Sequence, residues 1–166
     1  QLNLFKNNGL VQKIGISIYD FDCIDKIFDI FVPDLIQLPF NIFDQRLLEG
    51  NNLQKIKSKN IELHARSIFL QGTLLTDPKK LPKYFNQWRN LYQKWEDSCR
   101  KQNISKIEAS IMCAMNIKEI DGIVIGFENL SQIKECYNSR FSKILNFKHH
   151  DINNVDLIDP RRWQYE

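Results

Sequence analysis

One local pattern occurs four times in this chain: a short apolar segment ends in a polar residue or a glycine, and a segment with helical periodicity follows. The expected strands are Gln12–Tyr19, Asp34–Leu38, a strand that opens at Ile61, and Gly122–Gly126. Strands this short and apolar, each followed by a helix, predict a parallel sheet with right-handed crossovers. The pattern therefore indicates an α/β fold.

The third unit, residues 61–75, is the most informative of the four. Its alternating apolar and polar residues predict a strand, and a loop with Arg66, Ser67, Gln71 and Gly72 follows. In α/β proteins, polar groups and a glycine just beyond a buried strand are typical of ligand sites.

Helical periodicity fills the segments between the strands and places two helices after the third strand. The predicted helices cover Asp20–Phe31, Asp44–Lys57, Leu81–Arg100, Ser105–Met115 and a helix capped by Asn129 that runs to about Leu145. The first residues, Gln1–Asn8, are expected to form the last turns of a helix, and the tail from Asn146 to Glu166 is expected to be irregular.

Two architectures fit the order βα, βα, βαα, βα. One is an open doubly wound sheet, and the other is half of a (β/α)8 barrel, whose full length is typically about 250 residues. Four units and a helix without a beginning favour the half-barrel. We therefore predict that residues 1–166 form a single partial domain, half of a TIM barrel with an extra helix after the third strand.

The composition limits the classes of partner. Apolar residues make up 43% of the 166 residues and charged residues 26%, with a net charge of +3. The Lys and Arg residues are spread along the chain, so no nucleic-acid partner is expected. No apolar run approaches the ~18 residues of a membrane span, and no signal peptide is evident, so a cytoplasmic protein without a membrane partner is expected.

The four cysteines, Cys23, Cys99, Cys113 and Cys136, form no CxxC pair and have no histidine at metal-binding spacing. We expect small buried side chains in a reducing compartment and no metal site. His64 alternates within a strand and is expected to be a packed or surface residue. No HExxH motif, no Ser/His/Asp order and no paired carboxylates stand out, so no catalytic residue is predicted in this chain.

Each expected strand ends in a candidate binding group: Ser17, Gln37, Arg66 with Ser67, and Gly126. In a barrel these ends converge on one opening. Gln37 lies within an apolar run, and a buried amide without partners costs about 1–3 kcal/mol. A ligand carboxamide could satisfy it, although neighbouring backbone could do so equally well.

A phosphate site is possible without either standard glycine motif, since GxGxxG and GxxxxGK[ST] are both absent. Gly126 precedes a helix that starts near Leu130, and free N–H groups at such a helix start can hold a phosphate. Gln71 and Gly72 could bring backbone close to the same ligand. The alternative is that both glycines are ordinary loop residues.

Four blocks in this order and spacing resemble the C-terminal half of the aldo-keto reductase family, NAD(P)H-dependent (β/α)8 barrels. They are GLVQKIGISIY, DLIQLPFNIFDQR, IELHARSIFLQGTLL and GIVIGFENLSQIKEC, within roughly residues 9–140. The family reads them as the fifth to eighth barrel strands and their loops, and RSIFLQG is the most telling part.

The resemblance implies a cofactor role for eleven residues. Ser17 and Gln37 are expected at the nicotinamide carboxamide. Arg66 is expected against the nicotinamide ring, where many relatives have an aromatic ring. The residues expected along the pyrophosphate are Ser67, Leu70, Gln71 and Gly72, and those expected at the adenosine end are Gly126, Ser131, Gln132 and Glu135. Ile18 and Cys136 stand where relatives often have Asn.

The activity implied by the resemblance is reduction of an aldehyde or ketone by hydride transfer from NADP, with NAD as the alternative, and with a tyrosine as general acid. The family's catalytic Asp, Tyr, Lys and His belong to the first four strands, and no segment here matches them, so this fragment alone is expected to be inactive. The alternative is a non-catalytic half-barrel that binds nucleotides or self-associates through its exposed sheet edges.

Overall fold

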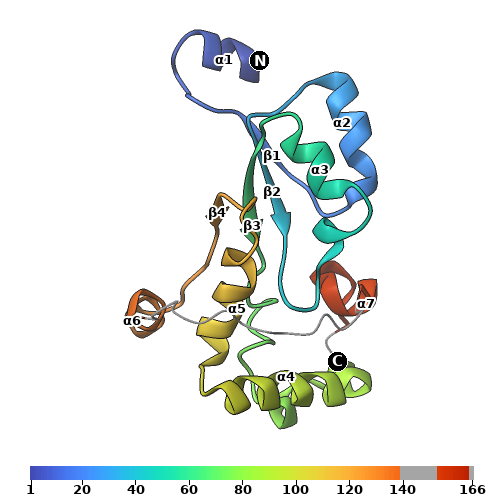
Figure 1. Cartoon of the computed structure of the whole chain (residues 1–166), viewed down its shortest axis with the longest axis vertical. Helices are drawn as coiled ribbons and strands as arrows, with labels where there is room; N and C mark the ends of the chain where they lie inside the picture. Colours follow the sequence, from blue (N-terminus) through green and yellow to red (C-terminus); the bar gives the residue numbers. More distant parts are fainter. Residues whose placement is uncertain (139–152, 165–166) are drawn as a thin grey trace.

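The computed structural model describes residues 1–138 and 153–164. Its sheet has four parallel strands, β1 (Gly15–Ser17), β2 (Leu35–Pro39), β3 (Glu62–Arg66) and β4 (Gly122–Ile123), in the order β1-β2-β3-β4 (Figure 1). A doubly wound sheet reverses its strand order at the ligand site. The described strands follow the chain order without a reversal, as strands on an arc of a barrel do.

Helices connect the strands as the sequence predicted, including the extra helix after the third strand. The α-helices are α1 (Leu2–Asn7), α2 (Ile24–Ile30), α3 (Asn52–Lys57), α4 (Arg89–Gln102), α5 (Lys106–Met115), α6 (Leu130–Asn138) and α7 (Val155–Ile158). Five short 3-10 segments accompany them: η1 (Phe21–Cys23), η2 (Arg46–Leu48), η3 (Pro78–Lys80), η4 (Lys83–Trp88) and η5 (Pro160–Arg162).

The two faces of the sheet differ in burial. Ile36, Leu38, Leu63 and Ala65 are fully buried on one face, in a cluster with side chains from α2, α3 and α5. The residues that alternate with them, such as Gln37 and His64, are only half-buried. Since alternate residues of a strand point to opposite faces, the helices cover one face, and the described residues leave the other open.

A second apolar cluster lies beyond the carboxyl ends of the strands, where α4 and α7 lie near each other in Figure 1. Phe85, Tyr92 and Trp95, from the segment predicted as a helix over residues 81–100, are buried in it. Trp163 from the tail packs edge-on against Phe85, with ring centroids 4.9 Å apart, and its indole N–H donates to the Leu157 carbonyl.

Several predicted boundaries were wrong. The helix expected over residues 44–57 divides into η2 and α3 at Gly50, whose φ of +51° is incompatible with a continuous helix. The helix expected over 81–100 begins only at Lys83, is 3-10 as far as Trp88 and becomes α-helical at Arg89. The strand expected over 122–126 contains only Gly122 and Ile123, and α2 begins at Ile24, later than predicted.

The tail is more ordered than its irregular sequence predicted. Asn154 caps α7 by accepting a hydrogen bond from the N–H of Asp156 at 3.0 Å, and Asp159 caps η5, where Pro160 is the first residue. Leu157, Ile158 and Trp163 anchor the segment in the second cluster. The predicted end of the last helix at Leu145, and the start of the tail, lie outside the described residues.

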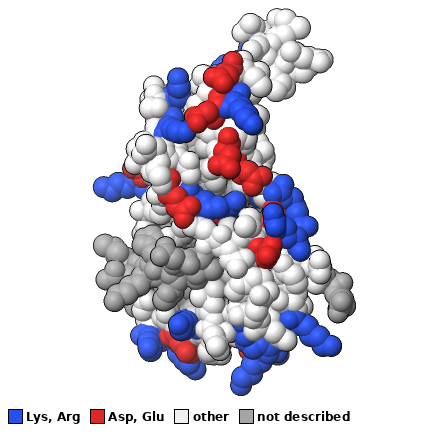
Figure 2. Space-filling model, turned by 90° about the vertical axis from the view of Figure 1, so that its right-hand side faces the viewer, with Lys and Arg blue, Asp and Glu red and all other residues white. Residues whose placement is uncertain are grey.

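Many surface charges lie beside charges of the opposite sign. Figure 2 shows Lys and Arg side chains beside Asp and Glu side chains on one face of the molecule. The ion pairs include Lys6–Asp34 at 2.5 Å, Lys55–Asp25 at 2.6 Å and Lys57–Asp121 at 2.8 Å. Over the described ranges, no helix combines the length and the apolar content that crossing a bilayer requires.

Candidate functional site

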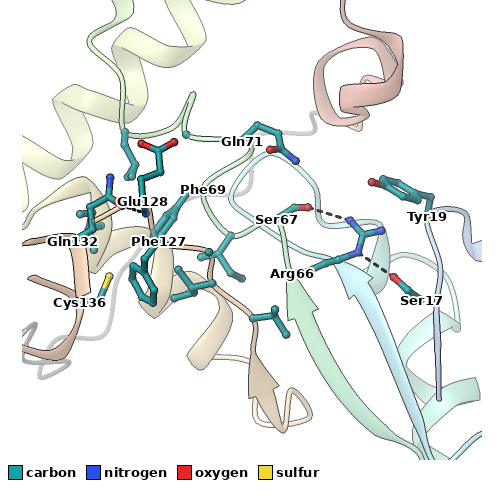
Figure 3. A pocket seen from close by; sticks show the side chains of 17 residues that line it. Ser17, Tyr19, Arg66, Ser67, Phe69, Gln71, Phe127, Glu128, Gln132 and Cys136 are labelled. Atoms are coloured by element: carbon teal, nitrogen blue, oxygen red, sulfur yellow. Dashed lines mark hydrogen bonds between the residues drawn. The ribbon is translucent and has the colours of Figure 1, made fainter. Parts of the chain in front are cut away.

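A cavity of about 790 Å³ opens at the carboxyl ends of the strands (Figure 3). It collects side chains from the end of β1, the β3–η3 loop, α5, the β4–α6 loop and α6. The lining residues are Ser17, Tyr19, Arg66, Ser67, Ile68, Phe69, Gln71, Gly72, Leu75, Ile107, Val124, Ile125, Gly126, Phe127, Glu128, Gln132 and Cys136. Residues far apart in the sequence thus share one hollow.

Seven of the eleven residues singled out from the sequence line this cavity: Ser17, Arg66, Ser67, Gln71, Gly72, Gly126 and Gln132. The other four do not. Gln37 is half-buried in β2, paired in register with Ser17, and Leu70 is fully buried within the β3–η3 loop. Ser131 and Glu135 are exposed on α6.

Arg66 connects β1 to the β3–η3 loop. Its Nε–H donates to Ser17 Oγ at 3.3 Å, Nη1 to Ser67 Oγ at 3.1 Å and Nη2 to the Ile18 carbonyl at 3.0 Å. The guanidinium carbon lies 4.0 Å from the centroid of the Tyr19 ring, within the range of a cation–π contact. The plane and the edge of this guanidinium are therefore both held in place.

The loop after β3 has an unusual backbone. Ser67, Leu70 and Gln71 have φ angles of +59°, +46° and +53°, and Gly72 follows at +82°. The two other non-glycine residues with positive φ among the described residues are both asparagines, which tolerate this conformation. A positive φ in other residue types is costly, by about 1–3 kcal/mol each, and such strain clusters at ligand sites. The Asn41 amide holds the loop by donating to the Ser67 carbonyl at 3.0 Å.

The start of α6 forms the opposite side of the cavity. Asn129 caps the helix as predicted, since its Oδ1 accepts from the Gln132 N–H at 3.0 Å. The Gln132 Oε1 in turn accepts from the Glu128 N–H at 2.8 Å, which fixes the loop on the helix (Figure 3). Burial raises the pKa of the neighbouring Cys136 thiol, so this thiol is a weaker acid than usual.

Sequence reasoning missed several members of the site, above all Tyr19 and Glu128. Tyr19 follows the first strand by two residues, a position that the strand-end rule could have included. It also contacts the tail, because the Arg161 guanidinium lies 4.0 Å from the same ring centroid. No local signal connects Arg161 with Tyr19, since 142 positions separate them (161 − 19).

A charged network joins the tail to the loops after β1 and β2. Arg161 pairs with Asp159 at 2.6 Å and with Asp20 at 3.7 Å, and Arg46 pairs with Asp44 at 2.8 Å and with Asp20 at 3.8 Å. Arg161 holds the pKa of the Asp159 carboxyl below its usual value. The network fixes Arg161, and through it the tail, beside Tyr19.

The cavity lining is suited to binding by hydrogen bonds, stacking and apolar contact. His64 lies outside it, and its Nε2 is 2.8 Å from Glu62 Oε1.

The cysteines are free thiols, and burial raises the pKa of both Cys99 and Cys113 to about 12. The described part of the chain brings no three His, Cys, Asp or Glu side chains together as a metal site would need.

Solved structures share this fold at low sequence identity. The holo form of the aldo-keto reductase AKR11C1 from Bacillus halodurans matches with a TM-score of 0.66 and 15% identity, over 86% of this chain and 48% of that chain. Its apo form matches with a TM-score of 0.66 and 14% identity, over 97% and 58%. The thermostable aldo-keto reductase Tm1743, in complex with the inhibitor epalrestat, gives 0.62 and 14%, over 86% and 48%.

These matches bear on fold and family differently. The chain spans about half the length of these reductases, so its fold is that of half a (β/α)8 barrel, as predicted. A search of the curated proteins found no match. The model of the Aldo/keto reductase family, however, matches residues 1–159, nearly the whole sequence. This chain therefore belongs to the aldo/keto reductase family.

Proposed function

We propose that this chain is the cofactor-binding half of an NAD(P)H-dependent oxidoreductase that reduces aldehydes or ketones. The observation that carries the proposal is the shared cavity, which gathers seven of the eleven residues expected to contact the cofactor. Family membership makes the enzyme class that of an oxidoreductase. When bound, the nicotinamide supplies the hydride that reduces the carbonyl carbon.

The proposed positions of the cofactor follow the lining. Ser17, with Gln37 beside it, would bind the nicotinamide carboxamide, and the plane of Arg66 would stack on the nicotinamide ring. The pyrophosphate would lie along Gln71 and Gly72, whose N–H groups donate no hydrogen bond within the described residues. Successive free N–H groups in such backbone form concave anion sites.

The adenosine end would lie at the β4–α6 loop, against Gly126 and Gln132, with Ser131 and Glu135 on the adjoining helix. Family resemblance makes NADP the first candidate for the cofactor. Segment 127–133 contains no Lys or Arg for a 2′-phosphate, however, and Glu128 lines the cavity there. NAD therefore remains the alternative, because a carboxylate suits a free ribose hydroxyl.

The test is a titration of the full chain with NADPH and with NADH, followed by calorimetry or by cofactor fluorescence. We expect saturable binding of at least one of them, and at least about tenfold weaker binding by Gln132→Ala, because the loss of an amide contact and of the loop bond to Glu128 costs about 1.4 kcal/mol or more. The matched control is Gln87→Ala, at an exposed position on η4, which should bind as the parent does.

Two results would contradict the proposal: no binding of either cofactor, or equal binding by Gln132→Ala.

Catalytic activity is a separate question from cofactor binding. Because the resemblance places the family's catalytic residues in the first four barrel strands, we propose that these 166 residues alone turn over no substrate, and that a small carbonyl compound is the substrate of the full-length protein. Aldehyde reduction by this chain alone would refute that part.

A second candidate function is self-association as a half-barrel module. The observation that favours it is the sheet, in which β1 and β4 each pair on one side only and one face is open among the described residues. Apolar side chains are also exposed at the first helix and its loop, including Leu2, Leu4 and Leu10. Both features suit a second copy of the chain.

A further inference from the structure

Two arginines contact the Tyr19 ring, and their charges are balanced differently. Each guanidinium carbon lies 4.0 Å from the ring centroid. Arg161 has two carboxylate partners, Asp159 at 2.6 Å and Asp20 at 3.7 Å. Arg66 has no ion pair with any carboxylate of the described residues, and its acceptors are two hydroxyl groups and a backbone carbonyl.

Arg66 also retains hydrogen-bonding capacity. A guanidinium has five N–H donors, and three of those of Arg66 are used, one on each nitrogen. One N–H on each terminal nitrogen is left. The terminal nitrogens of a guanidinium form a fork that can match the two oxygens of one carboxylate or phosphate.

The cavity leaves this positive charge uncompensated. Among the described lining residues, the charged side chains are Arg66 and Glu128. Figure 3 shows them on opposite sides of the cavity, with Arg66 beside Tyr19 and Ser17, and Glu128 beside Gln132. A half-buried cation that meets only neutral acceptors lacks its most favourable partner, which is an anion.

A purely structural role explains only part of this arrangement. The hydrogen bonds to Ser17 Oγ and to the Ile18 carbonyl connect β1 with the end of β3, and a neutral donor could provide them. The charge, the Tyr19 contact and the two remaining N–H groups of a residue that lines the cavity are not needed for that connection. They are features of a prepared anion site, because the guanidinium is already held in one orientation.

We propose that Arg66 is the recognition residue for an oxyanion in this cavity, a carboxylate or a phosphate bound at the edge of its guanidinium. The inference rests on the proposed function for the identity of the full ligand. Two sources of the oxyanion are then available, the carboxylate of an acidic carbonyl substrate and the pyrophosphate of the cofactor. In either case the nicotinamide would need a face of the guanidinium that Tyr19 does not contact.

The test measures the binding of three probes to the full chain by calorimetry: inorganic pyrophosphate, pyruvate and methyl pyruvate. We expect the chain to bind at least one of the two anions. Arg66→Gln should weaken that binding by about 10- to 100-fold, since charge-assisted hydrogen bonds are lost. Methyl pyruvate lacks the charge, so the substitution should leave its binding, weak or strong, unchanged.

Two further variants complete the test. Arg89→Gln removes the same charge outside the cavity lining, where Arg89 Nη2 donates to Asn86 Oδ1 at 2.5 Å, and it should bind the anions as the parent does. Arg66→Lys keeps the charge but loses the planar fork. It should bind more weakly than the parent and more tightly than Arg66→Gln, and it serves alone if Arg66→Gln does not fold.

The outcomes distinguish a substrate carboxylate from the cofactor pyrophosphate as the source of the oxyanion. They also distinguish a failure of the proposed function from a failure of this inference. An Arg66-dependent loss with pyrophosphate alone assigns the site to a phosphate, and with pyruvate alone to a substrate carboxylate. The inference fails if the chain binds neither anion, or if the Arg66 variants bind both as the parent does. Anion binding without NADH or NADPH binding would overturn the proposed function only, and cofactor binding without anion binding would overturn this inference only.

Discussion

Asp34 is the side chain that connects α1 to the sheet. Its carboxylate accepts from Lys6 Nζ at 2.5 and 2.7 Å and from the Ile14 N–H at 2.9 Å. The hydrogen bond with Lys6, and then that with Ile14, lowers the pKa of this carboxyl from its usual value of 3.8. The charged form is therefore favoured in the folded protein.

The lowered pKa predicts a pH-dependent contribution of Asp34 to stability. A carboxyl with a lowered folded pKa stabilises the protein above its unfolded pKa and loses this effect as the pH falls through the folded value. We expect Asp34→Asn to lower the urea midpoint at about pH 6. The two proteins should converge below the usual value of 3.8. A difference of unchanged size at about pH 2.5 would contradict the assignment.

The residues of the cavity show what sequence reasoning can find locally. Ser17, Arg66, Ser67 and Gly126 were identifiable because parallel strands deliver their carboxyl ends to one edge of a sheet. The contact of Arg161 with Tyr19 was not, since it depends on where the tail packs. Predictions from strand ends therefore find groups on the sheet, and they miss partners supplied by distant loops.

At the scale of elements, the pairing of β1 with β2 depends on a glycine. An added Cβ at Gly15 would lie 2.6 Å from the Leu35 carbonyl oxygen, so one of the two strands would have to shift. We expect Gly15→Ala to lower the free energy of unfolding by about 1–3 kcal/mol, as overpacking typically does. Chemical denaturation measures this change.

A second glycine provides the control for that measurement. A Cβ at Gly126 would meet no atom within 4 Å, so Gly126→Ala should change the unfolding free energy much less. Equal effects of the two substitutions would mean that the contact with Leu35 does not limit β1.

The elements themselves were predictable to different degrees. All four strands were located, because apolar alternation and terminal polar residues are local features. The sequence predicted one continuous helix around Gly50, and this was wrong. The apolar spacing continues across Gly50, but the positive φ of this residue interrupts the helical backbone. The tail was underestimated because α7 is only four residues long and depends on the burial of Leu157, Ile158 and Trp163.

For the whole molecule, the open sheet predicts association in solution. Among the described residues, no further strand pairs with the outer edges of β1 and β4, and Leu2, Leu4 and Leu10 are each more than half exposed. We expect light scattering to give a mass of twice the 19.7 kDa of one chain, in a concentration-dependent manner. A mass of 19.7 kDa at every concentration would exclude self-association.

A ligand bound in the cavity would affect how firmly the strand–helix units are held together. Its walls come from positions as distant in the chain as Ser17 and Cys136, so an occupant would touch both the first and the last strand–helix unit. Such an occupant would act as a removable, noncovalent cross-link. Its binding free energy would stabilise the contacts between these units. The half-barrel would therefore be most stable when the cavity is occupied.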